Sequence, residues 1–112
     1  MVIILDDIRS MANIGSVFRT ADAFRVEHIY LCGITATPPH REIHKTALGA
    51  TDSVEWSHEK DVISLIERLK EKHFSIVALE QADQSVSLEK FIPVTGKKLA
   101  LVFGNEIKGV KE

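Results

Sequence analysis

Two short apolar segments flank an amphipathic helix pattern at the start of the chain, and this arrangement constrains the fold more than any other feature. The first segment, Val2–Leu5, has the length and apolar character of a buried strand. A helix pattern follows, in which four apolar residues share one face: Ile14, Val17, Phe18 and Ala21. His28–Cys32 is a second strand-like run. Strand, helix and strand within about 30 residues predict a parallel βαβ unit.

The remaining chain continues the alternation of strands and helices. Thr35–Pro39 contains two adjacent prolines, which exclude a helix and predict an exposed loop. Further elements are predicted in chain order: a short helix within 40–50 that ends near Gly49, a strand at 54–56, a helix over 61–72, and strands over 74–79 and 99–103. We therefore predict a single domain, 1–112, of the α/β class, with a mostly parallel sheet flanked by helices.

Charge and cysteine content narrow the possible functions. The net charge is −2, so a nucleic-acid partner has to be bound by a local basic patch. Cys32 is the only cysteine, which excludes an internal disulfide and is typical of a reducing compartment. No apolar run approaches the roughly 18 residues that span a bilayer, and the N-terminal segment does not resemble a signal peptide. We therefore expect a soluble, cytoplasmic protein without a membrane partner.

Two polar segments are candidates for a functional site. Asn13 lies at the junction of the first strand and the helix, and Arg19 lies beside the apolar face of that helix. In parallel sheets ligands bind at the carboxyl edge, so Asn13 and Arg19 are candidates for a site there. The alternative is that Asn13 only caps the helix and Arg19 only extends into solvent. The second segment, 104–109, follows the last strand, and Glu106 lies between two glycines that allow a ligand to approach the backbone.

Several common sites are excluded by the same segments. Residues 104–109 have the glycine spacing of a P-loop, but Val110 stands where a lysine is required. The first strand is not followed by the glycine pattern of dinucleotide-binding folds. His40 and His44 would share a helix face, but no further ligand stands at a suitable spacing, so no metal site is predicted.

A basic segment offers a different interpretation of the same region. Arg41, His44 and Lys45 form a cluster that suits contacts with phosphate groups. The alternative is a solvated, charged helix face without a partner.

The two polar segments together resemble a known family. Asn13-x-Gly15 followed by Arg19-Thr20-Ala21, with the later Phe103-Gly104-Asn105-Glu106-x-x-Gly109, is similar to the motifs of the SpoU/TrmH-type RNA ribose 2′-O-methyltransferases of the SPOUT superfamily. The intervening segment 45–50 is also similar to a stretch of that family. The resemblance implies a SPOUT-type α/β fold with a C-terminal trefoil knot, a homodimer, and S-adenosylmethionine as cofactor.

The resemblance also implies roles for individual residues. The positions that match the family's catalytic residues are Asn13, Arg19 and Glu106. Those that match its cofactor loop are Phe103, Gly104, Asn105 and Gly109. The implied reaction is transfer of a methyl group from S-adenosylmethionine to the ribose 2′-hydroxyl of a tRNA or rRNA nucleotide.

The chain departs from the family's pattern at two places. It lacks the family's third motif, so we expect a domain that is truncated at its C-terminus, with an incomplete knot. Arg25 stands where the family often has glycine after the first helix.

The alternative function is a non-catalytic RNA-binding or dimerisation module that keeps the fold without a complete cofactor site.

Overall fold

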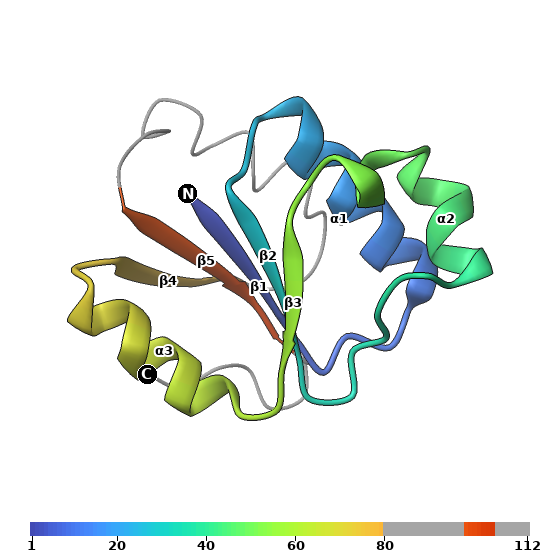
Figure 1. Cartoon of the computed structure of the whole chain (residues 1–112). Helices are drawn as coiled ribbons and strands as arrows, with labels where there is room; N and C mark the ends of the chain where they lie inside the picture. The colour runs from blue at the N-terminus through green and yellow to red at the C-terminus, as the bar shows by residue number, and fades with distance from the viewer. Residues whose placement is uncertain (80–97, 105–112) are drawn as a thin grey trace.

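The computed structural model describes residues 1–79 and 98–104, which form a parallel sheet with helices on both faces (Figure 1). The strands are β1 (Val2–Asp6), β2 (His28–Cys32), β3 (Trp56–Glu59), β4 (Ser75–Leu79) and β5 (Leu99–Phe103). The helices are α1 (Met11–Ala23), α2 (Arg41–Ala47) and α3 (Val62–Glu71), with a 3₁₀ turn η1 (Ala50–Asp52). The strand order is β3-β2-β1-β5-β4, and every neighbouring pair is parallel. The predicted α/β class is confirmed.

The helices divide between the two faces of the sheet. On one face, α1 and α2 pack together, and the face of α1 predicted from its spacing is buried against β1, β2 and β5. On the other face lies α3, with Leu65, Ile66 and Leu69 buried. Asp61 begins this helix, because its Oδ1 accepts a hydrogen bond from the Ile63 N–H (3.0 Å). The sheet lies between α3 on one side and α1 with α2 on the other (Figure 1), and it separates the two apolar cores.

Helix α1 begins earlier than the sequence predicts. Its N-cap is Ser10, whose Oγ accepts a hydrogen bond from the Asn13 N–H (3.1 Å). Asn13 is therefore the third helical residue, and the interpretation of Asn13 as a helix cap is wrong. The reason is that Ser10 is an equally good capping residue, and the earlier start lets Met11 pack against the core.

The segment after α2 also differs from the prediction. The predicted helix end near Gly49 is confirmed, since Leu48 (φ 53°) and Gly49 (φ 90°) both adopt left-handed conformations. The strand predicted at 54–56 instead runs from Trp56 to Glu59. Val54 closes the preceding turn, because its N–H donates to the Ala50 carbonyl oxygen (2.9 Å) and its side chain is buried.

Two loops are joined at the carboxyl edge of the sheet, between β1 and β2. The Ile8 N–H donates to Thr35 Oγ1 (2.9 Å), and that hydroxyl donates to the Leu5 carbonyl oxygen (3.2 Å). The Ile34 N–H donates to Asp7 Oδ1 (3.0 Å). Thr35 is only 3% exposed, so the loop predicted to be exposed is partly buried. These bonds fix the path by which the chain enters α1.

Candidate functional site

The first strand and the last described strand end at the same edge of the sheet. β1 and β5 are paired in parallel, with Leu5 opposite Phe103. The chain leaves β1 toward α1, while Gly104 follows β5 directly. Asn105, Glu106 and Gly109 lie outside the described residues, so their predicted roles and the predicted meeting of Glu106 with α1 stay predictions.

Asn13 and Arg19 both have exposed side chains on α1. They are six positions apart, which places them about 9 Å apart along the helix axis and about 120° apart around it. A ligand that contacts both has to lie across the helix rather than along one face. Within residues 1–79 and 98–104, no carboxylate lies within ion-pair distance of Arg19, so its guanidinium is available to an anionic partner.

The side chain of Phe103 is buried, which limits how this residue can take part in the predicted cofactor binding. The ring is 1% exposed and belongs to the core between the sheet and α1. Only its backbone remains for a contact with a cofactor. Gly104, which comes next, adds no side chain at the end of the strand.

Gly15, the glycine of the first motif, has a packing role that the sequence analysis missed. A Cβ atom at Gly15 would collide with Thr46 Oγ1 and with the Ile43 carbonyl oxygen on α2. Thr46 Oγ1 also donates to the Ala12 carbonyl oxygen (3.0 Å). A glycine inside a helix pattern costs about 1 kcal/mol relative to alanine, and this cost was the available signal for a close helix contact.

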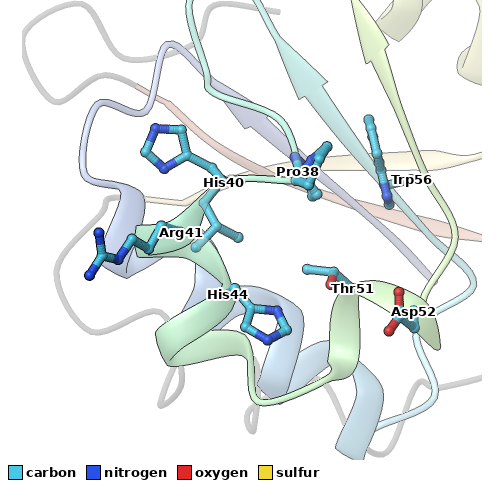
Figure 2. A pocket seen from close by; sticks show the side chains of 9 residues that line it. Pro38, His40, Arg41, His44, Thr51, Asp52 and Trp56 are labelled. Carbon is cyan, nitrogen blue, oxygen red and sulfur yellow. The ribbon is translucent and has the colours of Figure 1, made fainter.

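The predicted basic cluster lies on α2, where Arg41, His44 and Lys45 are all exposed. Two of the three, Arg41 and His44, line a cavity of about 600 Å³ (Figure 2). The complete lining is Pro38, Pro39, His40, Arg41, Ile43, His44, Thr51, Asp52 and Trp56. The cavity was not predicted, because its walls come from three segments that touch only after α2 and η1 pack beside β3.

Two further titratable groups lie on the α3 side of the sheet. Burial lowers the pKa of His28, and the nearby carboxylates Glu55 and Glu59 partly oppose this shift. Burial also raises the pKa of the Cys32 thiol to about 12. Cys32 is 0% exposed, as predicted for a residue in a buried strand. Both groups are separated by the sheet from α1 and from the cavity, so they belong to the packing of the fold.

The described part of the chain contains neither a cluster of metal ligands nor a helix that could span a membrane. Over residues 1–79 and 98–104, no three side chains of His, Cys, Asp or Glu gather as metal ligands would. None of the helices in those ranges has the length and apolar character required to cross a membrane.

Comparison with known proteins gives consistent matches over the whole chain. Residues 1–112 match the model of the SpoU rRNA Methylase family. An uncharacterized tRNA/rRNA methyltransferase of Borreliella burgdorferi is 28% identical over 97% of this chain and 46% of its own length. The 23S rRNA (guanosine-2'-O-)-methyltransferase RlmB of Nitrosomonas europaea is 30% identical over 99% of this chain and 42% of its own length.

A solved structure shares the fold. The AdoMet-bound rRNA methyltransferase from Sinorhizobium meliloti superimposes with a TM-score of 0.71, at 21% identity, over 98% of this chain and 41% of that one. The chain spans less than half the length of the two curated relatives above. Because the family model covers every residue from 1 to 112, the chain belongs to the SpoU rRNA methylase family.

Proposed function

We propose that the protein containing this chain transfers a methyl group from S-adenosylmethionine to the ribose 2′-hydroxyl of a tRNA or rRNA nucleotide. The observation that carries this proposal is the family match over residues 1–112, which includes both motif segments. The Nitrosomonas relative is a guanosine-2'-O-methyltransferase, which supports the ribose as acceptor. The AdoMet-bound relative from Sinorhizobium supports the cofactor.

The described end of β5 fits a cofactor that is held by backbone groups. Gly104 has no side chain, and the Phe103 ring is directed into the core, so neither side chain obstructs the strand end. We assign Phe103, Gly104, Asn105 and Gly109 to cofactor binding. S-adenosylmethionine supplies an electrophilic methyl group on a sulfonium.

Arg19 is assigned to positioning of the substrate. A guanidinium stays charged in proteins, and the Arg19 side chain is exposed to solvent. It therefore binds a phosphate or the 2′-oxygen of the target nucleotide instead of removing the proton. Glu106 orients Arg19, and Asn13 holds the nucleotide by hydrogen bonds. Correct placement of two reactants is worth about 7–11 kcal/mol of a reaction barrier, so positioning is a substantial contribution.

The proposal extends to partners and assembly. RNA is bound in part by the basic cluster on α2, which consists of Arg41, His44 and Lys45. The protein is a cytoplasmic homodimer, and residues 1–112 belong to one methyltransferase domain of the knotted SPOUT type. The family match over residues 1–112 supports this part of the proposal.

The experiment is a methyl-transfer assay on the full-length protein with methyl-labelled S-adenosylmethionine and tRNA and rRNA transcripts. Nuclease digestion should release a labelled 2′-O-methylnucleoside. Arg19→Lys should lose about 100-fold or more in rate, because lysine lacks the planar fork of donors. Arg68→Lys on α3 is the matched control and should keep full activity, since it lies on the opposite face of the sheet.

Three results would contradict the proposal. Label on a base would exclude the ribose acceptor, and full activity of Arg19→Lys would remove Arg19 from the site. Absence of S-adenosylmethionine binding by the full-length protein in calorimetry would favour the non-catalytic RNA-binding module.

A further inference from the structure

The cavity beside α2 is lined by polar and aromatic side chains that have no role in the methyl transfer proposed at α1. One wall is α2, with His40 at its start and His44 one turn later. The opposite wall is formed by Asp52 of η1 and Trp56 of β3 (Figure 2). A volume of about 600 Å³ lies within the range of small-molecule and nucleotide sites.

Trp56 provides an aromatic surface in this cavity. Its indole is half-buried, packs partly against the core that contains α1, and lines the cavity with the rest. Pro38 and Pro39 add apolar surface beside it. Aromatic side chains of this kind bind unpaired bases by stacking, which is how proteins most often recognise single-stranded RNA.

Asp52 restricts which base can bind. In the part of the chain that the structure describes, no cation lies within ion-pair distance of its exposed carboxylate. An ionised carboxylate only accepts hydrogen bonds, so it repels phosphate and attracts adjacent N–H donors. Guanine presents two neighbouring donors, N1–H and the exocyclic amine, which suit a carboxylate fork. Adenine, cytosine and uracil each place an acceptor beside their donor on that edge.

The α2 side of the cavity suits the backbone of the same nucleotide. Arg41 extends from α2 away from Trp56 and Asp52, toward the outer rim (Figure 2). The His40 Nδ1 atom accepts a hydrogen bond from the Glu42 N–H (3.3 Å), so the neutral ring carries its proton on Nε2 and can donate. Cationic and donor groups on the α2 side match phosphate, while the acceptor and the aromatic ring lie on the opposite wall.

We propose that this cavity binds one unpaired guanine of the RNA substrate. The base stacks on Trp56, its N1–H and N2–H donate to the Asp52 carboxylate, and its phosphate lies near Arg41. This inference rests on the proposed function only in taking RNA as the partner. It assigns a recognition site distinct from the methyl acceptor site at α1.

The test uses uridine pentamers with a central guanosine, adenosine or uridine, in the absence of S-adenosylmethionine. Trp56 is the only tryptophan of the chain, so quenching of its fluorescence reports binding at the cavity. The guanosine pentamer should bind about 10-fold more tightly than the other two, the scale expected for one bidentate base contact. Asp52→Asn should abolish this preference, whereas Glu67→Gln, an equal charge change on exposed α3 surface, should leave it intact.

Stacking is tested separately with fluorescein-labelled pentamers, since the aromatic variants change the intrinsic signal. Trp56→Phe should weaken binding of all three pentamers moderately, and Trp56→Ala should weaken it at least 10-fold, with helical circular dichroism unchanged in both. Equal binding of the three pentamers, or a guanosine preference that survives Asp52→Asn, would overturn the inference.

The outcomes separate this inference from the proposed function. A guanosine preference without methyl transfer would leave the cavity assignment standing and remove the enzymatic proposal. Methyl transfer by the full-length protein with no guanosine preference at the cavity would support the enzymatic proposal and remove the cavity assignment.

Discussion

Gly15 of α1 lies against Thr46 of α2 so closely that no side chain fits between them. The Thr46 hydroxyl donates to the Ala12 carbonyl oxygen (3.0 Å) and thereby joins the two helices by a hydrogen bond as well. This contact connects the first motif of the chain with the segment 45–50. It sets the position of α2, and with it the cavity, relative to Asn13 and Arg19.

Gly15→Ala should destabilise the protein by about 1–3 kcal/mol, the usual cost of overpacking. Alanine would gain about 1 kcal/mol in helix propensity, but the collision with the Ile43 carbonyl oxygen involves backbone that cannot rotate away. The clash therefore outweighs the propensity. Urea unfolding followed by circular dichroism measures the difference.

The neighbouring position provides the control for this change. Ser16→Ala, on the exposed side of the same turn, should change the free energy of unfolding by less than about 0.5 kcal/mol. Thr46→Ala should not rescue Gly15→Ala, since the Ile43 carbonyl oxygen remains in place. A stabilised Gly15→Ala protein would show that the two helices separate without cost.

Thr35→Val should destabilise by about 1–3 kcal/mol, although the two side chains have nearly the same shape. The Thr35 hydroxyl is buried and serves the Ile8 N–H and the Leu5 carbonyl oxygen, so valine leaves the buried N–H without its acceptor. Thr35→Ser keeps the hydroxyl and should lose less. If serine and valine were equally destabilising in urea unfolding, the methyl group and not the hydrogen bonds would account for the effect.

The order of strands and helices follows from local apolar patterns, which is why most of it was predictable. His28–Cys32 and 99–103 are short, mostly apolar runs of the length of a strand, and the structure has both strands as predicted. The helix predicted over 61–72 is α3, and its apolar face is buried as predicted. The two errors, at Asn13 and at 54–56, concern where an element begins. Ser10 caps α1 earlier than the apolar pattern indicates, and the turn after Gly49 delays the start of the next strand.

The candidate site was predictable only in part, for a different physical reason. Exposed Arg41 and His44 were found because consecutive charges on a short helix are visible in sequence. Asp52 and Trp56 were not assigned to a site, because their placement opposite α2 depends on the packing of Gly15 against α2 and on the pairing of β3 with β2. Contacts of this kind carry no periodic signal along the chain.

The half-buried His28 should make the protein less stable in mild acid. Burial lowers its pKa in the folded state below the ordinary 6.5, so the unfolded chain binds more protons between these two values. Its contribution to stability is therefore complete above about pH 6.5 and is lost as the pH falls toward the folded-state pKa. Urea unfolding at about pH 7.5 and about pH 5.5 should show the loss, and His28→Gln should reduce it.

A second variant tests the electrostatic part of this account. Glu55 raises the pKa of His28, so Glu55→Gln should lower that pKa further and steepen the acid loss. A Glu55→Gln protein with a shallower pH dependence than the parent would contradict the assignment to His28.

Arg25→Gly should stabilise the protein by about 0.5–1 kcal/mol. Arg25 closes α1 in a left-handed conformation (φ 59°), which costs a residue with a Cβ atom about 1–2 kcal/mol. Glycine removes that cost, and part of the gain is lost to the greater freedom of glycine in the unfolded chain, about 0.4–1 kcal/mol. Arg25→Ala retains the Cβ atom and should therefore leave stability nearly unchanged. Thermal and urea unfolding of the two variants separate the causes. Equal stabilisation by alanine would assign the effect to loss of the guanidinium. A gain confined to glycine would assign it to the left-handed backbone conformation.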